Sequence, residues 1–258
     1  MLREMRGQVL RQYHEEKQVL GQQVRTKMRA ESRSQMHAKV RTKELMTAAV
    51  SRLLETYADL AQRRSHLFAD LLGGQVPRQW RHYPEDDAID PVGGFQWFYH
   101  AHAPQDRPAA CEHGHIHLFA RRKLWTRRLR SMREIAFARL SGEPPASHNP
   151  RHLLSIGFDA KGVPTTIFTV NSWVTGDRML SAPLTADILQ HMTLDTGNEA
   201  VDAVIGSLVR LYREEIDGLL CQRDQALFAW PGDQVLSDQR LELLSELRID
   251  VDRKLRAI

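Results

Sequence analysis

The chain has 258 residues, of which 42% are hydrophobic and 26% charged, a composition typical of a globular protein with a sizeable core. No segment approaches the roughly 20 apolar residues that span a bilayer, the N-terminus lacks the apolar core of a secretory signal, and the cysteines are too few for a secreted disulfide scaffold. We therefore expect a cytoplasmic protein that does not enter a membrane.

The net charge of +4 is distributed unevenly along the chain. Residues 1–43 contain eleven Lys or Arg and four Glu, a net charge of +7, whereas the remainder carries −3. This basic arm has few apolar side chains at helical spacing, which predicts a helical or disordered extension. Its charge would allow contact with nucleic acid. Residues 44–258 are predicted to form a single domain.

The domain is predicted to begin with one or two amphipathic helices. Apolar residues recur every three or four positions from Leu45 to Leu72, and a pair of glycines ends the pattern. Residues 82–91 contain two prolines and four acidic residues, which predicts a loop. The first strand of a sheet is therefore expected after this loop.

Four strands are predicted, at residues 95–102, 113–120, 152–158 and 165–170, because these segments are rich in aromatic, β-branched or apolar residues between turn formers. The last third of the chain is predicted to be helical, at residues 184–192, 200–227 and 238–258. The sequence thus predicts an α+β fold, in which a mainly antiparallel sheet of about four strands is flanked by N- and C-terminal helices.

A histidine cluster lies on the first predicted hairpin, residues 95–120. Side chains alternate between the two faces of a strand, so His100 and His102 share one face, and His113, His115 and His117 share a face of the next strand. Two registers, in which opposite residue numbers add up to 215 or to 217, both align these faces. Either register leaves an apolar set on the opposite face. The histidine pattern and the apolar pattern therefore agree on which residues face each side of the sheet.

Neutral imidazole is the commonest metal ligand in proteins, and residues on adjacent strands can reach one ion. His113 and His117 are about 13 Å apart along their strand, so one ion cannot bind all five histidines. We predict that His100, His102, His115 and His117 supply the ligands of a divalent metal, Fe, Zn or Mn. Glu112, His113 and Asp87 are the candidate catalytic residues, as general bases or as partners of the ligands.

These features predict a mononuclear non-haem metalloenzyme of the hydrolase or oxygenase type that acts on a small molecule. A basic segment directly after the histidine strand would suit an anionic substrate or nucleic acid. Its candidate contact residues are Arg121, Arg122, Lys123, Arg127 and Arg128. A metal-binding interaction protein without catalysis remains the alternative.

Two short motifs resemble those of known enzyme classes. The string His113-Gly-His-Ile-His-Leu-Phe119 resembles that of the histidine-triad nucleotide hydrolases and transferases, which would imply nucleophilic attack by His115 on a phosphate, although Gly114 departs from the pattern. His115-Ile-His117 is also similar to the His-hydrophobic-His motif of relaxases and replication-initiator endonucleases. That resemblance would imply a metal-dependent single-strand DNA endonuclease, with Tyr212 as a helix-borne nucleophile.

A combination of strings between residues 80 and 177 resembles an uncharacterised bacterial family, a domain of unknown function. The strings are His82-Tyr-Pro84, Tyr99-His-Ala-His102, Glu112-His-Gly-His-Ile-His-Leu-Phe119 and Asn171-x-Trp173-Val-Thr175. In combination they are far more specific than the short motifs. The resemblance implies no particular chemistry.

Overall fold

The computed structural model describes residues 36, 40–101, 112–139, 150–232 and 234–258. The chain divides into two compact units, Met1–Ala48 and Ala49–Ile258. The predicted basic arm, residues 1–43, lies almost entirely outside the described residues, and residues 40–62 are helical. The second unit, which contains the sheet and the histidines, is described below.

A six-stranded antiparallel sheet forms the centre of this unit, with the strands side by side in chain order. They are β1 (Tyr83–Ile89), β2 (Phe95–Ala101), β3 (Gly114–Ala120), β4 (Arg151–Phe158), β5 (Pro164–Val170) and β6 (Leu243–Arg248). The predicted α+β class is confirmed. The sheet has two strands more than expected, because β1 and β6 were not predicted as strands.

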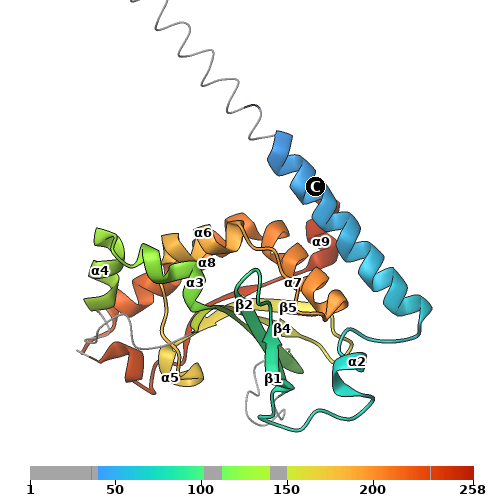
Figure 1. Cartoon of the computed structure of the whole chain (residues 1–258), viewed down its shortest axis with the longest axis horizontal. Helices are drawn as coiled ribbons and strands as arrows, with labels where there is room; N and C mark the ends of the chain where they lie inside the picture. The colour runs from blue at the N-terminus through green and yellow to red at the C-terminus, as the bar shows by residue number, and fades with distance from the viewer. Residues whose placement is uncertain (1–35, 37–39, 102–111, 140–149, 233) are drawn as a thin grey trace, which may run out of the picture. The chain divides into compact units, whose positions relative to one another are not determined.

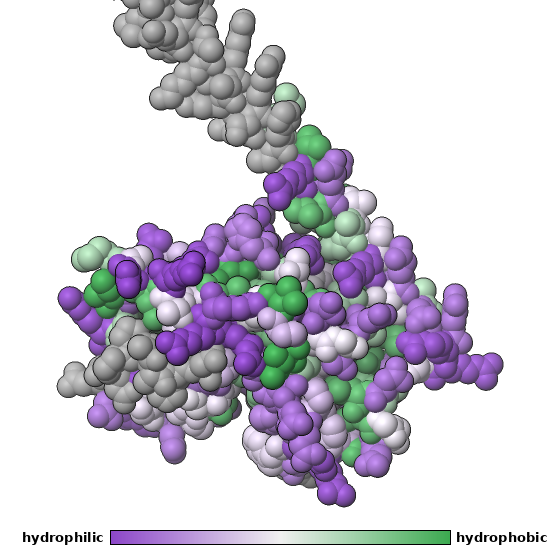
Figure 2. Space-filling model, viewed as in Figure 1, coloured by the Kyte–Doolittle hydropathy of each residue, from purple (hydrophilic) through white to green (hydrophobic). Residues whose placement is uncertain are grey.

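The helices lie before, between and after the strands in sequence. They are α2 (Ala69–Leu72), α3 (Arg122–Trp125), η1 (Thr126–Arg128), α4 (Met132–Ala138), α5 (Ser172–Thr175), α6 (Ala182–Gln190), α7 (Glu199–Leu211), α8 (Arg213–Ala229), η3 (Val235–Ser237) and α9 (Val251–Arg256). Figure 1 shows α6 and α8 together on one side of the sheet. In the described part of the chain, no helix is both long and apolar enough to cross a membrane, and the face drawn in Figure 2 is mainly hydrophilic.

The segment predicted as an acidic loop, residues 82–91, instead contains the edge strand β1. It pairs with β2 at Tyr83 and Tyr99 and again at Ala88 and Trp97, with an irregular stretch between the two pairs. The acidic residues Glu85 and Asp86 of that stretch are exposed. An edge strand tolerates charges, prolines and bulges that a central strand does not, so these residues do not prevent pairing.

The C-terminal helix predicted for residues 238–258 is wrong for most of its length. Residues 243–248 form β6, which pairs with β5, and the Thr169 and Ser245 hydroxyls are 2.7 Å apart across this pair. Helix α9 begins only after Asp250, whose side chain accepts a hydrogen bond from the Arg253 N–H. The leucine spacing in this short segment fits neither the helical nor the strand period clearly. Pairing with the available edge of β5 therefore makes the segment a strand. The predicted helix 200–227 is likewise interrupted, at Tyr212, between α7 and α8.

A buried carboxylate ties β2 to α7 on the helix-covered face of the sheet. The Trp97 indole N–H donates to Asp202 Oδ1 at 2.9 Å, and the Thr196 backbone N–H donates to Asp202 Oδ2 at 2.6 Å. Burial raises the pKa of Asp202, while its hydrogen bonds oppose that change. Trp97 lies three residues before His100, so this contact fixes the strand that carries the histidine.

We expect Asp202→Ala to lower the free energy of unfolding by about 2–3 kcal/mol, because it leaves the buried Trp97 and Thr196 donors without acceptors. Urea unfolding followed by circular dichroism measures the change. Glu214→Ala, at an exposed position of α8, is the control and should shift the free energy by less than about 0.5 kcal/mol. An Asp202→Ala protein as stable as the control would contradict the role given to this carboxylate.

Candidate metal centre

The pairing of β2 with β3 brings histidines from both strands together. His100 is directly opposite His115, so opposite residue numbers add up to 215, one of the two predicted registers. His117 follows two positions after His115 and lies on the same face. Trp97, Leu118 and the other apolar residues of opposite parity are buried on the other face of the hairpin.

Three imidazoles of this face point their Nε2 atoms at one another. His115 Nε2 lies 2.6 Å from His100 Nε2 and 3.0 Å from His117 Nε2. The three ligand atoms all lie within 4.8 Å of one another. His100, His115 and His117 are only 9%, 3% and 1% exposed. A cluster of solvated imidazoles on an open sheet is therefore excluded, and we name these residues the histidine triad.

The outer nitrogen of His115 lies against a carboxylate. His115 Nδ1 is 3.1 Å from Glu112 Oε1, and both side chains are about 4% exposed. The Thr166 hydroxyl donates to the other carboxylate oxygen, Glu112 Oε2, at 3.2 Å. A carboxylate in this position accepts the Nδ1 proton, which leaves a lone pair on Nε2 that points into the triad.

The outer nitrogen of His117 meets a second polar pair. His117 Nδ1 lies 2.8 Å from Ser155 Oγ, which in turn is 3.1 Å from His152 Nε2. Burial, and secondarily the nearby Arg223 charge, lower the pKa of His152 to about 3, so this ring is neutral. A consistent network has His117 Nδ1–H donating to Ser155 and the Ser155 hydroxyl donating to His152. In that network His117 also turns a lone pair inward.

In that network the triad has more lone pairs than protons. One proton on His100 Nε2 satisfies the contact with His115, but the His115 and His117 lone pairs still face each other 3.0 Å apart. Two buried acceptors at this distance repel unless a positive charge lies between them. Three convergent neutral imidazoles are a donor set that suits zinc, iron and other divalent transition metals. The arrangement can therefore hold a metal ion.

The walls around the triad are aromatic. The Phe168 ring lies 5.1 Å from that of His115, and the Phe98 ring lies 5.2 Å from that of His117. Phe98 and Phe168 are both buried. Apolar walls exclude water and lower the local dielectric, which strengthens the interaction between a bound cation and its ligands.

The space beside Glu112 exists because residue 157 is glycine. A Cβ built at Gly157 would lie 2.1 Å from Glu112 Oε2 and 2.3 Å from Thr166 Oγ1. Any larger residue on this part of β4 would displace the carboxylate from His115. Gly114 has a related role on the opposite face, where a Cβ would lie 2.4 Å from the Tyr99 hydroxyl oxygen. This contact explains why an apolar residue, as in the histidine-triad hydrolase string, does not fit at position 114.

We expect Glu112→Gln to weaken metal binding roughly 10–100-fold, the usual cost of losing an outer partner of a metal ligand. The amide keeps the size of the side chain but removes the charge that stabilises His115 as a ligand. Competition with a chromophoric chelator measures the dissociation constant. Glu85→Gln, at a side chain 76% exposed, is the matched control, and equal affinities for the two variants would contradict the role of Glu112.

Of the other predicted site residues, those that the structure describes lie outside the triad. His102 lies outside the described residues. His113 is exposed, and its Nδ1 lies 3.3 Å from the Tyr99 hydroxyl, whereas the triad lies on the other face of the hairpin. Asp87 accepts from the Gln96 amide at 2.7 Å and lies 3.0 Å from His82 Nδ1. Glu112 lies behind His115, on the Nδ1 side.

The predicted anion-contact residues follow β3 on α3 and η1. Arg121 donates to the Gln96 side-chain oxygen Oε1 at 3.2 Å, Lys123 donates to the Pro91 backbone carbonyl at 2.8 Å, and Arg128 pairs with Asp187. Arg122 and Arg127 are exposed. Contact of this basic segment with an anionic substrate or nucleic acid stays a prediction.

Tyr212 does not occupy the position of a nucleophile. It lies at the junction of α7 and α8, is 4% exposed, and has Lys254 Nζ of α9 5.1 Å from its ring centre. Burial, and secondarily Glu215, raise the pKa of its hydroxyl to about 12, so the group keeps its proton. The endonuclease interpretation therefore has no support from this residue.

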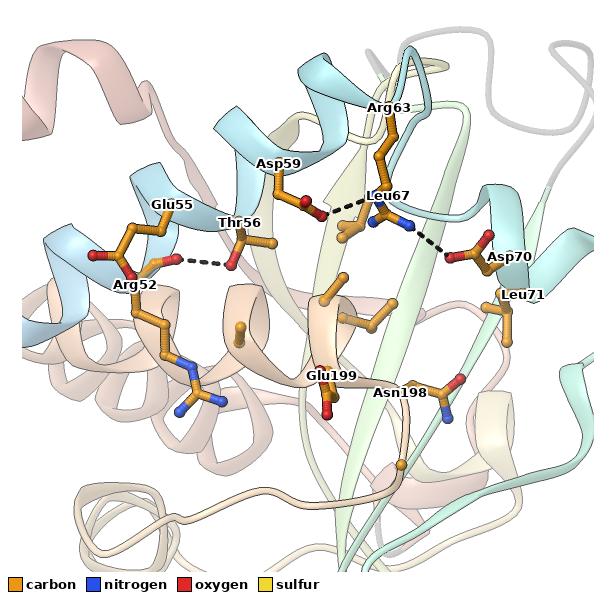
Figure 3. A pocket seen from close by; sticks show the side chains of 14 residues that line it. Arg52, Glu55, Thr56, Asp59, Arg63, Leu67, Asp70, Leu71, Asn198 and Glu199 are labelled. Carbon is orange, nitrogen blue, oxygen red and sulfur yellow. Dashed lines mark hydrogen bonds and ion pairs between the residues drawn. The ribbon is translucent and has the colours of Figure 1, made fainter.

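A groove elsewhere in the structure is lined by none of the predicted site residues. It encloses about 540 Å³ between residues 52–71 and the start of α7. Arg63 lies 2.9 Å from Asp59 and 3.5 Å from Asp70 on one side of this groove (Figure 3). The ionisable side chains that line it are two basic and four acidic, so the groove carries an excess of negative charge.

Sequence reasoning did not single out Ser155 or Thr166, which complete the outer contacts of the triad. Their only sequence signal is parity, since both lie on strands whose alternate residues face the histidines.

Comparison with known proteins gives a family and no described relative. No curated protein and no solved structure matches the chain. The match to a family covers residues 47–249, a range that contains the whole sheet and both histidine-bearing strands. It agrees with the resemblance that the strings between residues 80 and 177 indicated. The chain belongs to the family DUF6969, a domain of unknown function.

Proposed function

We propose that this protein is a mononuclear non-haem metalloenzyme, and that a divalent ion binds to the Nε2 atoms of His100, His115 and His117. The observation that carries the proposal is the convergence of the three Nε2 atoms, with separations of 2.6 and 3.0 Å, in a site almost closed to water. In the network described above, the His115 and His117 lone pairs face each other in a buried site, where a divalent cation between them would relieve their repulsion.

The outer contacts support the same proposal. Ligating histidines in proteins almost always donate their second ring N–H to a carboxylate, a hydroxyl or another acceptor, which fixes the tautomer and the ring orientation. Glu112 is positioned as this acceptor for His115, and Ser155 is positioned as this acceptor for His117. A core histidine that only fills space would not need polar partners placed at its outer ring nitrogen in this way.

Three protein ligands leave a coordination position for water or substrate, where a metal ion supplies a lowered pKa for bound water and polarises a bound oxygen. All three candidate ligands are neutral imidazoles, and the Glu112 carboxylate contacts His115 on the Nδ1 side of its ring, away from the ligand atom. Neutral ligands leave the charge of the ion uncompensated, which favours activation of water over redox chemistry. The hydrolase branch of the proposal therefore has the stronger support, with zinc as the expected ion.

In this proposal each outer residue has a separate task. Glu112 accepts the His115 Nδ1 proton and keeps the ring oriented, while Thr166 holds the second carboxylate oxygen. Ser155 and the neutral His152 do the same for His117. The phenylalanine walls exclude bulk water from the ligand atoms.

Cobalt replacement tests both parts of the proposal. Chelated protein without a histidine tag is titrated with Co²⁺, and the visible spectrum should saturate at about one equivalent per chain. Azide added to the loaded protein should then change the spectrum, because it occupies the open position. Failure to saturate would contradict metal binding. A saturated spectrum that does not change when azide or another small anion is added would contradict catalysis and favour the non-catalytic alternative.

A further inference from the structure

Trp80 lies at the edge of the triad and differs from the other aromatic residues around it. Its ring centre is 6.0 Å from that of His100, and the two rings are nearly perpendicular. Trp80 is 60% exposed, whereas Phe98 and Phe168 are buried. An indole next to a candidate metal ligand thus presents most of its surface to solvent.

The position of Trp80 follows from its backbone. Residue 79 forms a parallel bridge with Ala101, the last residue of β2, directly after His100. Trp80 itself has a φ of 62°, in the left-handed region that a residue with a large side chain rarely adopts. The chain therefore holds this indole beside His100 in a conformation that its own preferences oppose.

The triad is most accessible from this side. His100 is 9% exposed, against 3% for His115 and 1% for His117. His82 also borders His100, with ring centres 6.3 Å apart, and it stacks on Phe98 at 3.6 Å. Trp80 and His82 thus form the two solvent-facing rings next to the most exposed ligand, and we name them the entrance pair.

The polar side chains beside the entrance pair contact one another. Arg81 pairs with Glu85 at 2.7 Å, and His82 Nδ1 lies 3.0 Å from Asp87. The surface that Trp80 itself offers is apolar and planar. Such a surface favours a planar group, which stacks on an indole with a gain beyond the buried area.

We propose that Trp80 is a substrate-contacting residue of the metal site, and that it selects substrates carrying an aromatic or similarly planar group next to the group that binds the metal. The inference deepens the proposed function and rests on it. It assigns a specificity contact to a residue outside the triad and its outer partners.

Two probes with the same metal-binding head test the inference. Benzohydroxamate and acetohydroxamate differ only in a phenyl or a methyl group, and the spectrum of the Co²⁺-loaded protein reports the binding of each. We expect the native protein to prefer benzohydroxamate about ten-fold, and Trp80→Ala to reduce that preference to about two-fold or less. Trp80→Phe should keep part of the preference, because it keeps a ring.

The controls separate this inference from the proposed function and from folding. Val92→Ala, at a position 87% exposed in the turn between β1 and β2, should leave the preference unchanged. Trp80→Ala should bind Co²⁺ with the native stoichiometry and should melt no lower than Val92→Ala, since a strained exposed residue adds little to stability. Native protein that binds no Co²⁺ would overturn the proposed function. A loaded Trp80→Ala protein with the native preference, or a native protein with none, would overturn the role of Trp80 alone.

Discussion

Replacement of His115 by alanine is expected to reduce bound metal from about one ion per chain to less than a tenth of an ion. His115 is the middle member of the triad, with its Nε2 at 2.6 Å from that of His100 and at 3.0 Å from that of His117. Its loss removes one of three ligands and also removes the imidazole that contacts the Glu112 carboxylate. The effect should exceed the roughly 10–100-fold cost of losing an outer partner alone.

Metal analysis of tag-free protein measures this effect directly. His191→Ala is the matched control, because that imidazole is 69% exposed at the end of α6 and lies far along the chain from the triad. It should retain the native metal content. His115→Asn, which keeps a polar side chain of similar size, guards against misfolding, and circular dichroism reports the fold of each variant. Native stoichiometry in a folded His115→Asn protein would refute the assignment of His115 as a ligand.

Removal of the metal is expected to destabilise the protein. A ligand that binds only the folded state, present at 100 to 1,000 times its dissociation constant, contributes about 3–4 kcal/mol to the free energy of unfolding. For a domain of this size that corresponds to a decrease in Tm of roughly 10 °C. Repulsion between the inward lone pairs of His115 and His117 adds to the effect once the cation is gone.

Differential scanning calorimetry of loaded and chelated protein checks this expectation. His117→Ala is the informative control, because a chain that cannot bind the ion should melt at one temperature with or without the chelator. The Asp202→Ala variant should instead melt lower than the native protein but show the full response to chelation, since its contact lies on the other face of the sheet. A chelator that leaves the native Tm unchanged, or that lowers the Tm of His117→Ala equally, would argue against a stabilising ion at the triad.

Much of the histidine site follows from strand parity. Alternation on two adjacent strands placed His100, His115 and His117 on one face and an apolar set on the other. The choice between the two registers did not follow, because a shift of the pairing by two residues keeps every side chain on its own face. Only the hydrogen bonding of the whole hairpin selects the pairing of His100 with His115.

The outer contacts were less accessible to sequence reasoning. Glu112 precedes β3, and its direction depends on the turn that enters the strand and on the space left by Gly157 on the neighbouring strand β4. Asp87 was a candidate base, but the irregular pairing of β1 turns it towards His82 and Gln96 instead. Both outcomes depend on contacts between segments distant in the chain, which local pattern does not encode.

The two missed strands have the same cause. β1 and β6 are the edges of the sheet, where each strand has one neighbour and tolerates a pattern that a central strand would not. Acidic residues in β1 favoured a loop, and closely spaced leucines in β6 favoured a helix. The central strands carry a stronger hydrophobic signal because both of their faces are buried.

Anomalous diffraction at the absorption edge of the bound metal tests the central claim most directly. Crystals of tag-free protein, loaded with zinc or cobalt, should give one peak at about 2.0–2.1 Å from the Nε2 atoms of His100, His115 and His117. Glu112 should remain on the Nδ1 side of His115, beyond ligand distance. A peak bound elsewhere, or rings that diverge around an empty space in metal-loaded crystals, would contradict the assignment of these three histidines as a metal site.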